Sequence, residues 1–393
     1  MKSLSTLLLT YVFLPVASLL SNGIPLKTDR AIFVFDNGEK NMIASMLRYA
    51  EANDKFTLDN LDFCIIFMGA SLDSIDKEPF SHYPDKMIPY KELGIEESID
   101  YQWKREEKIT PKSIANLCRS MSVQKKIWTG VSCSIFTQLI ELYQTNPSLE
   151  VVALKDNPSP DGDTDYFKVA SEVQRAAYKI ALPSKVDYLD KEIAVIGHGP
   201  IEEWQIEAEQ INKQAIVAKL GLDPLIPIIV YVGGYGDTYQ ESFERFLDLL
   251  PDVKVQVLIV PHPRYKGSVE AKLCQNFTYQ WAQVKLVGEF VKEPSLRIKT
   301  VEAIAIGDLV ITPDPTSTIV FQANALKKKV LYINKVSTKI SEIFSDRKLI
   351  IPVLDSKQFL EVIKDPSLAQ EDIFSLLEIP KNGAKLLWDE FVN

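Results

Sequence analysis

The chain has 393 residues, of which 46% are hydrophobic and 25% are charged, and its formal net charge is −9. These proportions are those of a globular protein long enough for about two domains. The negative balance argues against a nucleic-acid partner, because proteins that bind nucleic acids carry an excess of Lys and Arg. Only three histidines and four scattered cysteines without a CxxC spacing are present, so we expect no bound metal and reduced cysteines.

The first 26 residues form a segment of their own. An apolar run at 7–20 follows Lys2 and is shorter than the ~20 residues that span a bilayer. Small residues stand nearby, at 17, 18 and 21, a pattern typical of a signal peptide or of a membrane anchor. Lys27 and Arg30 come after the run, which favours a cytoplasmic location for the rest of the chain. We expect membrane association on the cytoplasmic side, with a cleaved leader and a secreted or periplasmic protein as the alternative.

Residues 27–200 alternate short apolar runs with helical patterns, which predicts a first domain of βα units. The first predicted strand starts at Ala31 and is followed by Asp36, Asn37, Gly38 and Glu39. The other strands are predicted at 61–69, 87–88, 126–129, 150–154, 179–183 and 193–196. Because the carboxyl ends of parallel strands share one edge of the sheet, Asp36, Glu39 and Asp156 are expected there. For His198, which follows the last of these strands, we favour a structural role in a turn.

A charged helical pattern from Glu202 to Leu220 separates this domain from a second one, so we place a linker helix at 201–225. The second domain, 226–375, repeats the βα alternation. Its strands are predicted at 228–232, 255–260, 284–286, 309–311 and 330–332. The tail at 376–393 is predicted to be a helix that packs back on the first domain. These features predict an α/β protein with two tandem Rossmann-like domains that face each other across a cleft.

Three strands of the second domain end in polar or glycine-rich turns. The strand at 228–232 leads into Gly233, Gly234 and Tyr235, where the missing Cβ atoms allow a ligand to approach the backbone. The strand at 255–260 leads to His262, Pro263 and Arg264, and the strand at 309–311 leads to Thr316, Ser317 and Thr318. Each turn precedes a predicted helix whose N-terminal amides favour an anion. Together they predict a phosphate-binding site, although Ser317 and Thr318 are also explained by helix capping alone.

One acidic loop has the spacing of a calcium site. Asp161, Asp163, Asp165 and Glu172 stand at positions 1, 3, 5 and 12 of an EF-hand pattern. Position 6 needs glycine and holds Tyr166 instead. We therefore predict an acidic loop that caps the following helix and binds no metal.

On these motifs the chain resembles the GT-B glycosyltransferases, whose two Rossmann-like domains bind the nucleotide-sugar mainly on the second. In bacterial sialyltransferases and CDP-glycerol-type transferases a His-Pro motif and a later Ser-Ser/Thr motif hold the donor phosphate, and His262-Pro263 and Ser317-Thr318 stand here in that order. The resemblance also implies that an acid between these motifs, Glu289, contacts the ribose or the base. The first-domain acidic motif of sialyltransferases is echoed by Asp36-Asn37-Gly38, with Asn in place of the second acid.

The resemblance implies an inverting, metal-independent transfer of a sugar from a CMP-, CDP- or UDP-linked donor to a glycan or lipid. Retaining relatives carry Glu-x7-Glu, whereas this chain has Asp314 and Gln322 at that spacing. Asp36 or Glu39 would take the proton of the acceptor hydroxyl, and His262 would assist the leaving phosphate. No cofactor is expected, because the nucleotide-sugar is a co-substrate. The predicted donor-binding residues are Gly233, Gly234, Tyr235, His262, Pro263, Arg264, Glu289, Thr316, Ser317 and Thr318.

Two alternatives stay open. UDP-N-acetylglucosamine 2-epimerases share the fold, so an enzyme of that kind fits the same motifs. A non-catalytic periplasmic ligand-binding protein also has two α/β domains, and a cleaved leader would suit it.

Overall fold

The computed structural model describes fourteen stretches of the chain, and the account below is confined to them. They are residues 26–34, 37–93, 121–130, 148–156, 179–182, 192–234, 239–250, 254–262, 267–274, 282–315, 317–333, 339–353, 355–364 and 371–393. The predicted leader, Asp36 and the acidic loop at 161–165 lie outside them. Within these stretches no helix is both long enough and apolar enough to cross a membrane.

The first domain is built on a parallel sheet in the order β3-β2-β1-β4-β5-β6-β7. Its strands are β1 (Leu26–Val34), β2 (Phe63–Phe67), β3 (Met87–Pro89), β4 (Met121–Gly130), β5 (Glu150–Leu154), β6 (Lys179–Leu182) and β7 (Glu192–Val195). The described helices are α2 (Asn37–Asn53), α3 (Lys55–Asn60) and four 3₁₀ turns at Gly69–Ser74, Phe80–His82, Pro84–Lys86 and Tyr90–Leu93. Helix α2 buries Met42, Ile43, Met46, Leu47 and Ala50, the i, i+4, i+8 face that covers the sheet.

The second domain has a parallel sheet in the order β10-β9-β8-β11-β12-β13. Its strands are β8 (Ile228–Val232), β9 (Val255–Val260), β10 (Ala282–Leu286), β11 (Leu309–Thr312), β12 (Lys329–Tyr332) and β13 (Ile351–Pro352). Its helices are α9 (Tyr239–Asp248), α10 (Ser268–Cys274), α11 (Thr300–Ile306), α12 (Thr318–Ala325), α13 (Lys339–Asp346), α14 (Ser356–Lys364), α15 (Ile373–Leu376) and a 3₁₀ turn at Pro294–Leu296. Separate apolar clusters cover the two faces of this sheet, which confirms the predicted α/β architecture.

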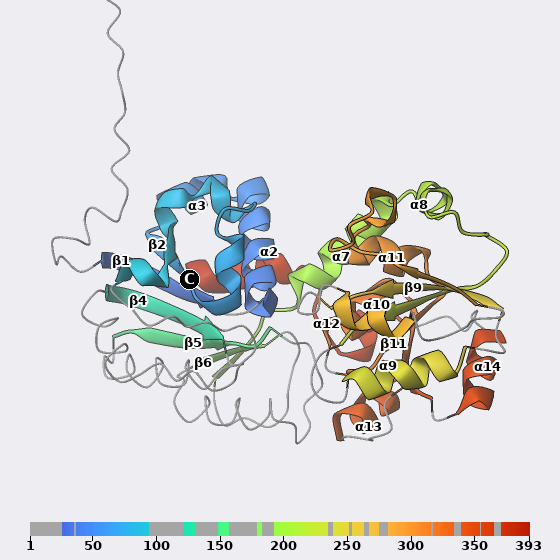
Figure 1. Cartoon of the computed structure of the whole chain (residues 1–393). Helices are drawn as coiled ribbons and strands as arrows, with labels where there is room; N and C mark the ends of the chain where they lie inside the picture. Colours follow the sequence, from blue (N-terminus) through green and yellow to red (C-terminus); the bar gives the residue numbers. More distant parts are fainter. Residues whose placement is uncertain are drawn as a thin grey trace, which may run out of the picture.

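Two helices connect the domains, α7 (Gly199–Gln210) and α8 (Lys213–Lys219) (Figure 1). Helix α7 packs against α2 on one side and against α11 and α12 on the other. The prediction of one continuous helix from Glu202 to Leu220 is wrong, because the chain breaks at Ile211 and Asn212. The side-chain oxygen of Asn212 accepts the amide of Ala215 at 3.0 Å and starts α8 as a new helix.

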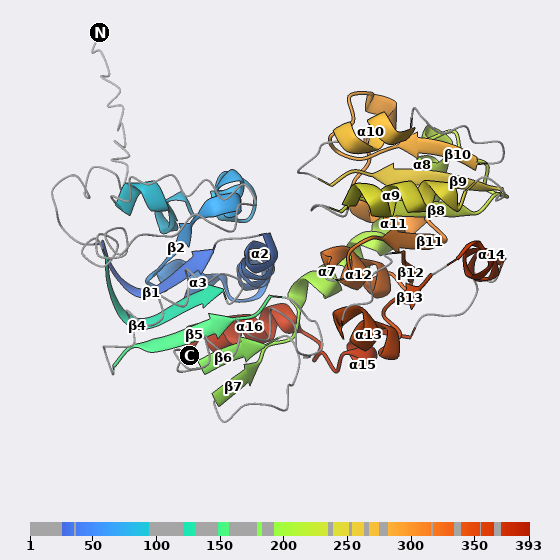
Figure 2. The ribbon, with the colours of Figure 1, turned by 60° about the horizontal axis from the view of Figure 1, so that its bottom comes forward.

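The last helix, α16 (Gly383–Val392), drawn in red in Figure 2, returns to the first domain and packs against α2 and α7. Arg30 donates to the carbonyls of Phe391 and Val392 at 3.0 and 2.6 Å, and Lys126 donates to that of Glu390 at 2.8 Å. Cations at a helix C-terminus satisfy its free carbonyls and oppose its dipole. The start of the first strand at Ala31 is therefore predicted wrongly. Strand β1 begins at Leu26 and includes the polar Arg30, whose side chain is satisfied by the carbonyls at the end of α16.

The cysteines that the structure describes are free thiols. Cys64, within β2, is buried, and Cys274, at the end of α10, is partly exposed. Burial raises the pKa of the Cys64 thiol to about 12, so this side chain stays a neutral apolar group of the core.

Candidate functional site

The glycine turn after β8 lies against the end of β9. The amide of Gly233 donates to the carbonyl of Val260 at 2.8 Å. A Cβ atom built on Gly233 would lie 2.7 Å from the backbone nitrogen of His262, closer than real Cβ contacts come. Glycine is therefore required here by the close approach of two strand ends, and His262 lies beside the turn.

The end of β11 meets the same turn from the other side. A Cβ atom on Gly234 would lie 2.8 Å from Pro313, the residue that follows β11. Ser317 then caps α12, and its hydroxyl accepts the amide of Ile319 at 3.4 Å. The structure thus gathers the ends of β8, β9 and β11 at one edge of the sheet, with the first turn of α12 beside them.

A buried, hydrogen-bonded pair of side chains, Tyr239 and Glu270, packs against the glycine turn. Tyr239, the first residue of α9, donates its hydroxyl to Glu270 Oε1 at 2.7 Å, and both residues contact the position where Gly233 would carry a Cβ. Burial raises the pKa of Tyr239, so the phenol remains protonated and keeps its role as donor. Glu270 is fully buried, and its Oε2 has no hydrogen-bond partner among the described residues. Neither residue belongs to a recognisable sequence motif, so neither could be predicted from the sequence.

The remaining predicted donor contacts divide into two groups. Glu289 is exposed, in the turn after β10, the strand next to β9. Thr318 is exposed at the start of α12. The other four, Tyr235, Pro263, Arg264 and Thr316, lie outside the described residues.

The first domain has an acidic cluster at the carboxyl edge of its sheet. Glu39, in the first turn of α2, is only 1% exposed, and a Cβ atom on Gly130 at the end of β4 would lie 1.2 Å from its Oε1. A Cβ atom on Gly38 would lie 1.5 Å from Asp156 Oδ2, just after β5. The two glycines therefore make room for the two carboxylates, and Gly130 is a further residue that the sequence analysis missed.

His198 joins this cluster to the linker helix. It is buried, its Nδ1 accepts the amide of Ile201 at 3.2 Å as the cap of α7, and its Nε2 lies 3.0 Å from the carbonyl of Asp156. In this arrangement the neutral ring donates through Nε2, and burial lowers the pKa of His198 to about 4. The predicted structural role of His198 in a turn is confirmed.

Stability should therefore fall on acidification. An unfolded histidine has a pKa of about 6.5, so between pH 6.5 and about 4 the unfolded chain binds the extra proton and the folded chain does not. We expect the first domain to lose about 3 kcal/mol of unfolding free energy across that range. Urea titrations at pH 7, 5.5 and 4 measure this loss. His198→Asn, which retains a capping oxygen, should show a smaller loss, and an equal loss in both proteins would contradict the assignment.

No group of three His, Cys, Asp or Glu side chains in the described ranges is placed to hold a metal ion. The expected metal independence stays a prediction, since Asp36 and the loop at 161–165 lie outside those ranges.

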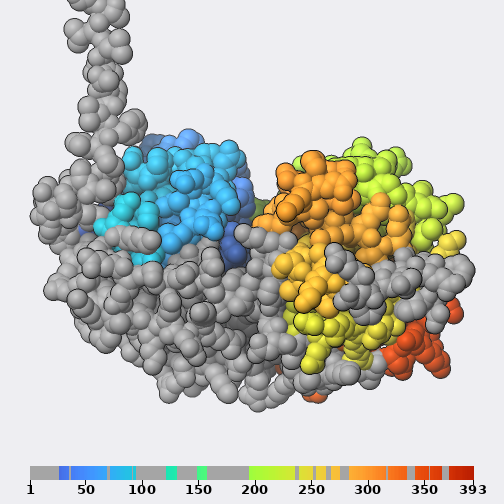
Figure 3. All heavy atoms as spheres, in the orientation of Figure 1, coloured from blue at the N-terminus to red at the C-terminus, as the bar shows by residue number. Residues whose placement is uncertain are grey.

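Two Rossmann-like domains joined by a bridging helix, with the last helix returned to the first domain, constitute the GT-B fold. In Figure 3 a notch separates the blue surface of the first domain from the orange surface of the second. The sequence itself matches no family model and no curated protein.

Solved structures of this fold match over almost the whole chain. UDP-GlcNAc 2-epimerase from Methanocaldococcus jannaschii is 12% identical, with 94% of this chain and 100% of that chain covered and a TM-score of 0.58. MurG from Acinetobacter baumannii is 10% identical, with 93% and 99% covered and a TM-score of 0.55. A UDP-glucosyltransferase from Polygonum tinctorium is 8% identical, with 94% and 98% covered and a TM-score of 0.55. At these identities the similarity shows a shared fold.

Proposed function

We propose that this protein is a glycosyltransferase that transfers a sugar from a nucleotide-sugar to a glycan or lipid acceptor. The observation that carries the proposal is the meeting of Gly233, Gly234, His262 and the N-terminus of α12 at one sheet edge. A glycine turn and a helix N-terminus beside a histidine suit the phosphates of a nucleotide. MurG and the UDP-glucosyltransferase, which share the fold, are consistent with this chemistry.

We assign the chemistry to the two facing sheet edges. His262 donates a hydrogen bond or a proton to the phosphate oxygen that leaves as the bond to the sugar breaks. An acid of the first domain, Asp36 or Glu39, accepts the proton of the acceptor hydroxyl as that oxygen attacks the sugar carbon, so the transfer inverts the sugar. Because Glu39 is buried, this role requires the acceptor to reach the carboxyl edge of the first sheet beside Gly130. The apolar run at 7–20 supports membrane association near a lipid acceptor.

A second candidate is an epimerase acting on a UDP-sugar. It is favoured by the match to the Methanocaldococcus jannaschii epimerase over that protein's full length. Consumption of UDP-GlcNAc without an acceptor would select the epimerase. Release of free nucleotide only when an acceptor is present would select the transferase.

Nucleotide binding is the first test, and we expect CMP, CDP or UDP to raise the melting temperature of the wild-type protein. A ligand at 100 times its Kd adds about 2.7 kcal/mol of stability. His262→Ala should weaken the affinity about tenfold or more, since a hydrogen bond to a charged group contributes about 1.5–3 kcal/mol.

The matched control is His82→Ala, because His82 lies in the first domain and pairs with Glu51 on the surface. It should keep the full response to nucleotide. If none of these nucleotides, nor GDP, nor their sugars shifts the wild-type melting temperature, the transferase assignment fails and a binding protein for another ligand becomes the better description.

A further inference from the structure

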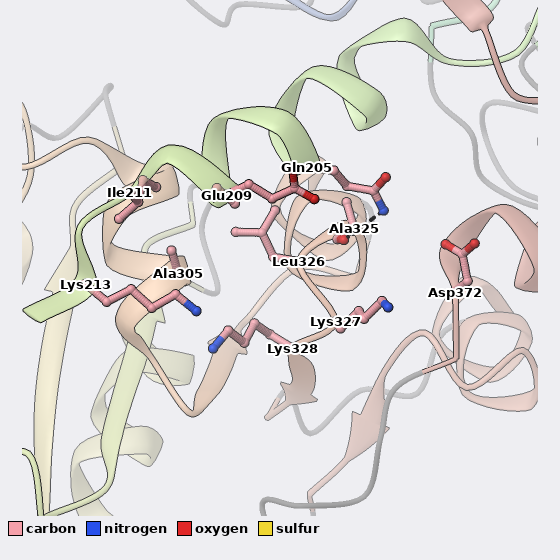
Figure 4. Close-up of a pocket in the computed structure, with 11 residues that line it drawn as sticks. Gln205, Glu209, Ile211, Lys213, Ala305, Ala325, Leu326, Lys327, Lys328 and Asp372 are labelled. Carbon is pink, nitrogen blue, oxygen red and sulfur yellow. Dashed lines mark hydrogen bonds between the residues drawn. The ribbon is translucent and has the colours of Figure 1, made fainter.

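A cavity of about 560 Å³ lies at the edge of the second sheet opposite to that of the glycine turn (Figure 4). It lies between the linker helices α7 and α8 and the C-terminal ends of α11 and α12. Lys327 and Lys328 immediately precede β12, so the cavity is at the amino edge of the sheet, whereas the glycine turn is at the carboxyl edge. This cavity is therefore distinct from the candidate nucleotide site.

Three lysines and two acidic residues line the cavity. Figure 4 shows the ammonium groups of Lys213, from α8, and Lys328, beyond α12, directed towards one another, whereas the side chain of Lys327 extends the other way, on the side of Asp372. Lys328 donates to the carbonyl of Gly307, whereas Lys213 and Lys327 make no ion pair within the described ranges. Burial, and then the charge of Lys213, lower the pKa of Lys328. In a chain of net charge −9, two ammonium groups that face each other, that of Lys328 partly buried, favour a bound anion between them.

The opposite wall offers hydrogen-bond acceptors. Glu209 from α7 and Asp372 at the start of α15 line the cavity. Gln205 uses its amide nitrogen to donate to the carbonyl of Ala325 at 3.0 Å, which leaves its amide oxygen to accept. These groups suit the hydroxyls of a polyol, and they would repel a second phosphate.

We propose that this cavity binds a small phosphorylated polyol, such as a sugar phosphate. Its phosphate would lie between Lys213 and Lys328, and its hydroxyl groups would donate to Glu209, Asp372 and Gln205. The volume falls within the range of sites for small molecules, about 300–1,000 Å³. Residues of the linker helix α7 and of the end of α12 both line the cavity. A bound ligand would therefore contact the linker and the second domain at once.

The test uses the full chain with glucose 6-phosphate as the probe and with glucose and inorganic phosphate as matched probes, at constant ionic strength. We expect saturable stabilisation by glucose 6-phosphate in thermal-shift and calorimetric titrations, with weaker binding of phosphate and none of glucose. Lys213→Gln should weaken the affinity about tenfold, because it removes a charge-assisted contact without emptying the core. Lys357→Gln, on the exposed face of α14, makes the same change of charge elsewhere and should leave the affinity unchanged.

His262→Ala separates this site from the nucleotide site. Binding that persists in His262→Ala and weakens in Lys213→Gln supports the cavity. Binding that weakens in His262→Ala alone places the probe at the glycine turn and overturns the proposal. Equal effects of Lys213→Gln and Lys357→Gln, or no saturable binding by the wild type, also overturn it.

Discussion

Gly233→Ala is expected to weaken nucleotide binding at least tenfold while the protein still folds. The new Cβ atom would lie 2.7 Å from the backbone nitrogen of His262 and 2.8 Å from Glu270 Oε1. Backbone cannot yield as the end of a flexible side chain does, so the ends of β8 and β9 must move apart. Overpacking of this kind costs about 1–3 kcal/mol of stability. Because the displaced atoms form the proposed phosphate site, affinity for the best nucleotide should fall at least tenfold, as measured by calorimetry.

Gly307→Ala is the matched control. Its Cβ atom would lie 2.5 Å from Val230 Cγ2, a clash with a side chain of the core, but Gly307 precedes β11 at the amino edge of the same sheet. We expect this variant to lose stability and to bind nucleotide with unchanged affinity. If both variants bind as the wild type does, the glycine turn is a structural connection only and the proposed donor site is wrong.

Phe391→Ala should cause the largest loss of stability in the first domain. The Phe391 ring is fully buried, and its centroid lies 5.7 Å from that of Phe63, 5.5 Å from that of Trp128 and 6.2 Å from that of Trp388. Removal of a buried Phe costs about 3–5 kcal/mol, and here it also loosens the attachment of α16 to the sheet. Denaturant unfolding followed by tryptophan fluorescence reports this transition, because two of the contacting rings are tryptophans.

Phe56→Ala provides the comparison, since the Phe56 side chain on α3 is 82% exposed. It should change the unfolding free energy by no more than about 0.5 kcal/mol. An equally small effect of Phe391→Ala would mean that α16 is not part of the cooperative unit of the first domain.

The architecture could be predicted from the amino-acid sequence, because the signals involved are local. The apolar strands Ile228–Val232 and Val255–Val260 are bounded by polar or glycine residues and lie at their predicted positions. Regular βα alternation predicts parallel sheets, and both sheets are parallel. Since parallel strands place their carboxyl ends together, the meeting of Gly233 with His262 also followed from strand order alone.

Several features of the proposed sites could not be predicted, because they depend on contacts between residues far apart in the chain. No local pattern shows that Glu270 and Tyr239 pair beneath Gly233, that Gly130 makes room for Glu39, or that Arg30 lies in a strand. The cavity around Lys213 and Lys328 also depends on such contacts, since these two lysines are separated by more than 100 residues and only the packing of α7 against α12 and of α8 against α11 brings them together. Burial and electrostatic coupling arise from such packing, so these sites become visible only in the folded chain.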